Sequence, residues 1–240
     1  MSKKIIEVRD LYAGYGKFKV LFNINFSANS GEITVIVGPN GAGKTTLLNS
    51  IMGIATIYSG SIKFEDMEVT KLPVYRKARM GLAYLPQYGN IAAGLTVEEN
   101  LRISGYLLNQ DEIDGRISDI LEMFPRLKEF LKRKAGTLSG GERRMLAIGM
   151  ALMRKPKVLL LDEITTDLAP LVVNQVLSKL AELRDSFGQT IVIVEQNAKK
   201  ALELGDKGYL LVSGEVRYEG DAKELLSHPQ FSRLYLGILR

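Results

Sequence analysis

The segment with the most specific chemistry is Gly38–Thr45, which fits the phosphate-loop pattern G-x-x-x-x-G-K-[ST]. Glycines let a backbone curl until successive N–H groups point at phosphate oxygens, and the following helix presents its positive end to the same anion. We expect Lys44 to reach the β- and γ-phosphates of a nucleotide and the Thr45 hydroxyl to ligate Mg²⁺. The alternative is a plain strand-turn-helix corner, and the flanking pattern favours the phosphate loop. The expected contact set is Gly38, Pro39, Asn40, Gly41, Ala42, Gly43, Lys44, Thr45 and Thr46.

A pair of carboxylates ends the buried-strand pattern that begins at Val158. Ligands of open α/β sheets lie beyond the carboxyl ends of the strands, which is where Asp162 and Glu163 fall. We expect Asp162 to hold Mg²⁺ through water, and Glu163 to accept a proton from the hydrolytic water or to orient it. Two solvated acids at a strand end are the alternative, and the phosphate loop in the same chain favours the catalytic interpretation.

Leu138–Glu142 reads Leu-Ser-Gly-Gly-Glu at the start of a predicted helix. Ser139 is a good N-cap, and Glu142 stands three residues later, so the segment is at least a capping box. Two glycines after the cap cost helix stability and are unnecessary for capping. They are reasonable if a second phosphate approaches the backbone at Gly140 and Gly141.

This segment, 23 residues before Asp162, resembles the signature sequence of ABC ATPases. The resemblance implies that the signature of one subunit closes over ATP bound at the phosphate loop of another, so that two chains sandwich two nucleotides. The residues implied to contact the partner's ATP are Leu138, Ser139, Gly140, Gly141 and Glu142.

Further positions match the same family. Tyr15 matches the aromatic residue that stacks on adenine, with a buried strand tyrosine as the alternative. Gln87 matches the glutamine that touches Mg²⁺ and water. Gln196 stands where most relatives carry a histidine against the γ-phosphate; its alternative is to cap a helix beginning near Asn197. The resemblance thus implies Lys44, Gln87, Glu163 and Gln196 as catalytic residues and Thr45, Gln87 and Asp162 around the metal.

Two other departures from the family pattern concern the loop after Glu163. Ile164 replaces the usual proline. Thr165–Asp167 replaces a run of small residues that normally lies across the dimer interface, and Asp167 places a carboxylate where glycine or alanine is common. These departures bear on the dimer contacts rather than on nucleotide binding.

Segments 136–142, 168–170 and 194–198 are similar to those of LivF-type subunits of branched-chain amino-acid importers, among which a glutamine at position 196 is known. The resemblance implies two membrane permeases, a second ABC ATPase subunit or a second copy of this chain, an indirect link to a solute-binding protein, and a peripheral position on the cytoplasmic face of the membrane. No nucleic-acid partner is expected. The alternatives are an ATPase for lipid or lipopolysaccharide export, and an ABC ATPase outside transport, which usually carries a long coiled coil or a second ATPase domain.

Short apolar strands alternate with longer helical patterns, which predicts an α/β fold with a largely parallel sheet. Antiparallel strands are expected over 4–30, with a hairpin over 61–69. Buried or short strands are expected at 33–37, 82–85, 158–161, 191–194, 207–212 and 215–219, and helices at 44–52, 170–186 and the C-terminal end. The family implies a P-loop NTPase with a RecA-like core, 1–87 and 154–240, that includes an antiparallel β-subdomain, and an inserted α-helical subdomain, 88–153, within one domain of 1–240.

Composition narrows the chemistry further. Cysteine is absent and His228 is the single histidine, which excludes disulfides, thiolate nucleophiles and multi-histidine metal sites. The composition, 46% hydrophobic and 25% charged, is typical of a globular protein. No apolar run approaches the roughly 18 residues that span a bilayer, and the N-terminal residues lack a secretory pattern. A net charge of +5 favours an ordinary solvated surface over a dedicated anionic partner.

Overall fold

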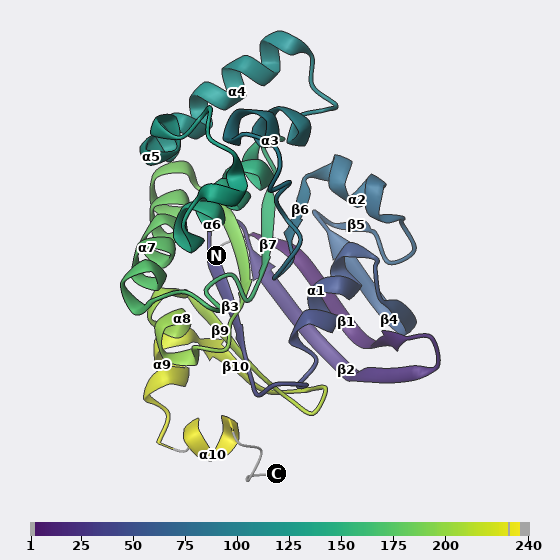
Figure 1. The fold of residues 1–240 in the computed structure, drawn as a ribbon. Coiled ribbons are helices and arrows are strands. Elements are labelled where there is room, and N and C mark those ends of the chain that lie inside the picture. The colour runs from purple at the N-terminus through teal and green to yellow at the C-terminus, as the bar shows by residue number, and fades with distance from the viewer. Residues whose placement is uncertain (1–2, 230, 236–240) are drawn as a thin grey trace.

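The computed structural model describes residues 3–229 and 231–235, and a largely parallel sheet forms its centre (Figure 1). The strand order is β10-β9-β3-β8-β7-β6, with β10 antiparallel at one edge. Every residue of β3, β7 and β8 is buried, as expected for parallel strands covered on both faces. The predicted strands are confirmed as β3 (Ile33–Val37), β6 (Leu82–Leu85), β7 (Val158–Asp162), β8 (Thr190–Val194), β9 (Lys207–Val212) and β10 (Glu215–Asp221).

A second, antiparallel sheet has the order β2-β1-β4-β5. The predicted pair over 4–30 is confirmed as β1 (Lys4–Tyr15) and β2 (Phe18–Asn29). The predicted hairpin is present, with Glu65 and Asp66 at φ 49° and 67° between β4 and β5 (Met67–Glu68). Its first strand is longer than predicted, because β4 (Thr56–Phe64) extends back to pair with β1.

Helices separate and cover the two sheets (Figure 1). The predicted helix α1 (Lys44–Met52) is confirmed and lies between the sheets, where Leu47, Leu48 and Ile51 join the core they share. The helix predicted over 170–186 is confirmed and ends at Gly188, its left-handed C-cap. The opposite face of the central sheet is covered by helices that include α7 (Pro170–Phe187), α8 (Ala198–Leu204) and α9 (Ala222–Ser227).

Between β6 and β7 the described chain forms helices, as the family resemblance implies. Thr96 begins α3 with a capping box, because its side chain accepts from Glu99 N–H while the Glu99 carboxylate accepts from Thr96 N–H. The helices between β6 and β7 are α3 (Val97–Ser104), α4 (Gln110–Met123), α5 (Pro125–Glu129) and α6 (Gly140–Leu152), with a 3₁₀ turn at Ala135–Thr137. A short helix that precedes β6, α2 (Val74–Met80), was not predicted.

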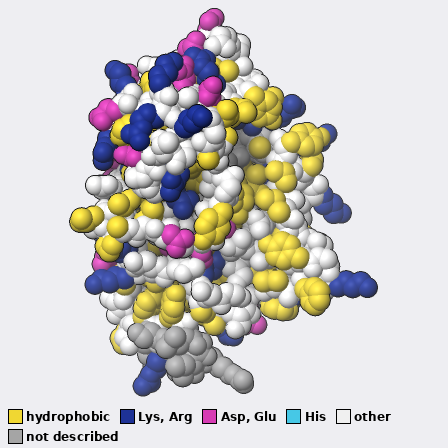
Figure 2. Space-filling model, viewed as in Figure 1, with side chains coloured by type: hydrophobic (Ala, Val, Ile, Leu, Met, Phe, Trp, Pro, Cys, Tyr) yellow, Lys and Arg dark blue, Asp and Glu magenta, His cyan; other side chains and the backbone are white. Residues whose placement is uncertain are grey.

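The boundaries of the helical segment as a subdomain, 88–153, stay a prediction, as does the division of the remaining chain. The predicted helical tail is confirmed over the described residues as α9 and α10 (Phe231–Tyr235). None of the described helices combines the length and the apolar character that crossing a membrane requires. Figure 2 shows charged side chains gathered over the α3–α5 end of the molecule and hydrophobic ones along the side that carries α2.

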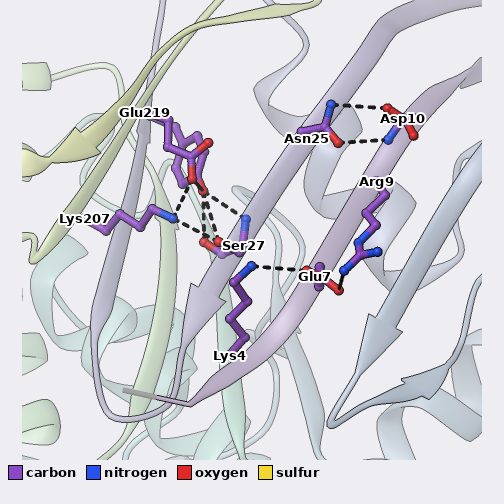
Figure 3. Close-up of polar contacts among 9 residues, drawn as sticks. Lys4, Glu7, Arg9, Asp10, Asn25, Ser27, Lys207 and Glu219 are labelled. Carbon is purple, nitrogen blue, oxygen red and sulfur yellow. Dashed lines mark hydrogen bonds and ion pairs between the residues drawn. The ribbon is translucent and has the colours of Figure 1, made fainter. Parts of the chain in front are cut away.

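A polar junction joins the two sheets at β2 and β9 (Figure 3). Tyr209 is 1% exposed, and its hydroxyl accepts from Ser27 N–H at 2.9 Å and donates to the Glu219 carboxylate at 2.8 Å. Lys207 Nζ donates to the same carboxylate at 2.7 Å and to Ser27 Oγ at 2.9 Å. Each buried polar group of this junction therefore finds its partner within the chain. We call Ser27, Lys207, Tyr209 and Glu219 the sheet junction.

Candidate nucleotide site

The phosphate loop joins β3 to α1 and lines a cavity of about 310 Å³. Gly43, at φ 99°, is the N-cap of α1 and supplies no side-chain cap, so the first N–H groups of the helix remain available to an anion. A Cβ at Gly43 would lie 2.6 Å from Leu21 Cδ2, so the turn requires glycine there. The cavity is lined by Val20, Asn40, Gly41, Ala42, Gly43, Lys44, Thr45, Thr46, Glu163 and Gln196.

Lys44 is folded back into its own loop. Its side chain is buried, and Nζ donates to the carbonyl oxygens of Gly38 at 2.9 Å and Pro39 at 3.1 Å. The ammonium also lies 3.6 Å from Glu163 Oε1. An ammonium held only by carbonyls and one carboxylate can exchange these partners for phosphate oxygens at little cost.

Glu163 is the point on which the predicted catalytic residues converge. Its Oε2 accepts from Gln196 Nε2 at 2.7 Å and from Gln87 Nε2 at 3.2 Å, while Oε1 faces Lys44. Gln196 is not the helix cap, because Asn197 is the N-cap of α8 and accepts from Lys200 N–H. The capping alternative for Gln196 is therefore wrong. Parallel pairing explains the convergence, since β3, β8 and β7 are neighbours and end at one edge of the sheet.

Asp162 precedes Glu163 in the sequence but contacts a different pair of side chains. Its carboxylate accepts from Thr45 Oγ1 at 3.0 Å and from the Tyr84 hydroxyl at 3.1 Å. Burial raises the pKa of Asp162, although both hydrogen bonds oppose the shift. Gln87, also predicted at the metal, contacts Glu163 instead. The described residues contain no cluster of three acidic or histidine side chains that could cage a metal.

Tyr15 ends β1 with 43% of its surface exposed, and its hydroxyl accepts from Asn49 Nδ2 at 2.7 Å. It is therefore not a buried strand tyrosine, so that alternative is wrong. Its ring is accessible to a planar partner, as adenine stacking requires.

The Leu138–Glu142 segment begins α6, away from the phosphate-loop cavity of the same chain. The capping box is confirmed, with Ser139 N–H donating to the Glu142 carboxylate at 2.8 Å and Ser139 Oγ accepting from Glu142 N–H at 3.3 Å. The structure supplies an internal reason for one glycine, because a Cβ at Gly141 would lie 2.5 Å from Val172 Cγ1. An approaching phosphate is thus not needed to explain that glycine.

The two departures in the loop after Glu163 are accommodated within the chain. Ile164 is fully buried in the core. Asp167 lies at φ 63°, a left-handed conformation that aspartate tolerates better than most residues, and its carboxylate accepts from the Tyr88 hydroxyl at 3.3 Å. Asp167 therefore ties this loop to the residue after Gln87.

Sequence reasoning missed three residues of the site. Tyr84 reaches Asp162 from β6, which pairs with β7. The Tyr235 hydroxyl lies 3.2 Å from the carbonyl oxygen of Gly38 and 3.4 Å from that of Gln196, so α10 returns to the phosphate loop. Glu195 binds Thr165 with both carboxylate oxygens. The only sequence signal for Glu195 was its position next to Gln196. Tyr84 and Tyr235 had no such signal.

The family model described as ABC transporter matches residues 21–166, which span the phosphate loop, the Leu138–Glu142 segment and both carboxylates. The chain is an ABC ATPase. A probable branched-chain amino acid transport ATP-binding protein LivF from Archaeoglobus fulgidus is 48% identical over 95% of this chain and 97% of its own length. BraG from Pseudomonas aeruginosa, a high-affinity branched-chain amino acid transport ATP-binding protein, is 42% identical over 93% and 95%.

The fold of this ABC ATPase is shared with solved structures. An ATP-binding cassette of an ABC transporter in its ADP conformation superposes with a TM-score of 0.89 at 29% identity, covering 98% of this chain and all of that one. The lipopolysaccharide export ATP-binding protein LptB of Escherichia coli is a more distant relative, 32% identical over 97% of both chains. The predicted family, α/β class and ATPase activity are confirmed.

Proposed function

We propose that this ABC ATPase supplies the energy for an importer of branched-chain amino acids. The two most identical relatives described above carry that substrate in their names, at 48% and 42% identity, against 32% for the lipopolysaccharide-export relative. The observation that carries the catalytic part of the proposal is the Glu163 carboxylate, which Lys44, Gln87 and Gln196 surround at the phosphate-loop cavity.

The nucleotide binds with its phosphates in the loop and its adenine on Tyr15. Lys44 leaves the carbonyls of Gly38 and Pro39 for the β- and γ-phosphates, a stronger charge-assisted pairing. The N–H groups of the loop and of the first turn of α1 complete the cradle. The residues proposed to contact ATP are Gly38 to Thr46 together with Tyr15.

The residues beside the phosphates fit Mg²⁺. A hydroxyl, a carboxylate and an amide oxygen are the hard ligands that this ion prefers, and Thr45, Asp162 and Gln87 supply them. The raised pKa of Asp162 reflects a carboxylate that burial has left short of compensating charge, as expected where a cation binds. When bound, Mg²⁺ neutralises charge on the β- and γ-phosphates.

Glu163 prepares the water. When Lys44 turns to the phosphates, Oε1 loses its cationic neighbour, while Oε2 stays fixed by the amides of Gln87 and Gln196. One carboxylate oxygen is then held and the other is free to accept from water, which is the arrangement a general base needs. Because an amide nitrogen has two protons, Gln196 can keep its bond to Glu163 and donate the second proton to the γ-phosphate.

Assembly completes the site. Leu138–Glu142 closes over ATP bound to a second ABC ATPase subunit or a second copy of this chain, and two permeases carry the pair at the cytoplasmic face of the membrane, with a solute-binding protein as an indirect partner. Support comes from a dimeric solved cassette bound to ADP and phosphate, similar to this chain with a TM-score of 0.78 at 25% identity.

Dimerisation tests this assembly. Glu163→Gln should dimerise with ATP but not with ADP, because only ATP offers a γ-phosphate to the opposing Ser139 and Gly140. Light scattering with each nucleotide measures it, and adding Lys44→Ala to Glu163→Gln is the control that should stay monomeric. A dimer indifferent to nucleotide would contradict the proposal, as would a monomer even when mixed with its second ATPase subunit. In the assembled transporter, branched-chain amino acids should stimulate turnover and lipopolysaccharide should not.

A further inference from the structure

The carboxylate of Glu195 is one of the most deeply buried charged groups in the described chain. Glu195 follows the last residue of β8 and is 2% exposed. Its Oε1 accepts from the Thr165 backbone N–H at 3.0 Å, and its Oε2 accepts from Thr165 Oγ1 at 2.7 Å. Both oxygens thus serve one residue, which stands two positions after Glu163 in the sequence.

The backbone at Glu163 needs such support. Glu163 has φ 47°, a left-handed conformation that costs a non-glycine residue energy and persists only where the surroundings impose it. On one side, Glu163 N–H donates to the Val194 carbonyl oxygen at 2.9 Å. On the other side, the chain is fastened by the two bonds between Thr165 and Glu195.

Gln196, the residue after Glu195, holds the Glu163 side chain, because its Nε2 donates to Glu163 Oε2 at 2.7 Å. Val194, Glu195 and Gln196 are consecutive, and each makes a different contact with the Glu163 loop. The end of β8 therefore fixes the entry to this loop, its exit and its carboxylate.

We propose that Glu195 is a positioning residue for hydrolysis, which holds the strained loop so that the Glu163 carboxylate faces the nucleotide cavity. The inference rests on the role proposed above for Glu163. It assigns to Glu195 no contact with substrate; the residue acts through Thr165 and the backbone.

Energetics distinguish this role from ordinary packing. A buried carboxylate destabilises a fold relative to an apolar side chain of the same size unless its hydrogen bonds offset the loss of hydration. Burial raises the pKa of Glu195 to about 7, against the opposing effect of both Thr165 bonds. The facing charges are Glu163, which raises this pKa, and Arg144, which lowers it. Burial thus disfavours the charged form of Glu195. The presence of a carboxylate at this position is explained if its two hydrogen bonds are needed to fix Thr165.

The test separates hydrogen bonding from bulk and charge. In Glu195→Gln the amide oxygen can still accept from Thr165 N–H and the amide nitrogen can donate to Thr165 Oγ1, so both contacts survive. Glu195→Leu keeps similar volume and loses both. Glu219→Leu is the matched control, because Glu219 also accepts two hydrogen bonds, but in the sheet junction.

We expect Glu195→Leu to lower kcat about 10- to 100-fold, because a displacement near 1 Å of a catalytic group costs about that much. Its MgATP affinity should stay within about threefold of the parent, and Glu195→Gln should retain kcat within about threefold. Glu219→Leu should melt earlier with unchanged kcat. A normal kcat in folded Glu195→Leu would overturn the inference, and so would equal losses of kcat and nucleotide affinity.

A double-mutant cycle makes the two proposals fail separately. If Glu195 acts through Glu163, adding Glu195→Leu to Glu163→Gln should lower single-turnover hydrolysis by less than about threefold further. An undiminished second loss would overturn the inference and leave the role of Glu163 standing. Parent-like turnover in Glu163→Gln alone would instead refute that role. Should Glu195→Leu fail to fold, Thr165→Val replaces it: we expect a loss of kcat of at least about threefold at unchanged affinity, and an unchanged kcat would overturn the inference.

Discussion

The nucleotide site and the sheet junction are both polar clusters where separate strands meet, yet their charges are balanced differently. In the junction, Lys207 and Glu219 lie 2.7 Å apart. Burial opposes both charged forms, but their mutual contact and Tyr209 outweigh it, so the pKa of Glu219 is lowered and that of Lys207 is raised. At the site, burial prevails and raises the pKa of Asp162 and of Glu195.

This difference in charge compensation distinguishes a structural cluster from a functional one. A cluster that pairs its own charges needs nothing more, so its expected role is to join two sheets. The site places Asp162 and Glu163 near the ammonium of Lys44, which is itself held by carbonyls that phosphate can replace. Such incomplete compensation is typical of functional sites, where a charged ligand completes the balance.

Gln196→Ala should give a large contrast between the regions. The substitution removes the amide that holds Glu163 Oε2 and that is proposed to reach the γ-phosphate. We expect turnover to fall roughly 10- to 100-fold with little change in ADP affinity, because a lost neutral donor and the oxygen it leaves unpaired together cost about 1–3 kcal/mol. Steady-state hydrolysis and ADP titration measure it. Parent-like hydrolysis would show that Gln196 has no γ-phosphate role.

Gln196→His is the matched variant, since the family resemblance implies histidine at this position. It should retain activity and add a titration near pH 6–7, because imidazole ionises in that range and an amide does not. Turnover from pH 5.5 to 8.5 would show it, and identical profiles for parent and variant would contradict the placement of this residue beside a charged group.

Tyr209→Phe should show the opposite signature. The Tyr209 hydroxyl is the acceptor for Ser27 N–H, and its loss leaves a buried donor unpaired, at a cost of about 1–3 kcal/mol in the free energy of unfolding. Turnover of the folded protein should stay within about twofold of the parent. Urea unfolding and steady-state hydrolysis together decide it; a loss of kcat without a loss of stability would erase the distinction between the two regions.

Glu219→Gln should produce the smallest effect, a slight loss of stability near neutral pH that disappears in acid. The folded-state pKa of Glu219 is lowered, so the unfolded chain binds the proton more readily and stability rises with pH between the two values. This contribution is present above about pH 4.5 and is lost as pH falls through the folded value. Because the side chain is 45% exposed, solvent screening keeps the effect below about 1 kcal/mol. Melting temperatures from pH 3 to 7 should fall less steeply for the variant; equal slopes would contradict the pairing.

Local motifs were predictable from sequence because their chemistry lies within a few consecutive residues. The phosphate loop, the Ser139 capping box and the strand before Asp162 were each predicted and are each present. The start of β4 was placed too late because its first residues are stabilised by pairing with β1 rather than by their own pattern. Helix α2 was missed because it has only 7 residues, too few for a periodic signal.

Contacts between distant segments were not predictable. Glu195 and Thr165 are 30 residues apart, and they meet only because β7 and β8 pair in parallel with Asp162 beside Val194. Tyr235 reaches Gly38 across 197 residues. The family resemblance placed Gln196 near a γ-phosphate, but its bond to Glu163 depends on side-chain geometry that no spacing encodes.

The most direct test of the account is the turnover and MgATP affinity of Glu163→Gln measured beside Glu219→Gln, two identical substitutions of carboxylates that each accept two hydrogen bonds. We predict that Glu163→Gln binds MgATP normally while turnover falls at least about 100-fold, the scale of general-base contributions. Glu219→Gln should hydrolyse ATP like the parent. Near-parent turnover in Glu163→Gln, or an equal loss in both variants, would contradict the central claim.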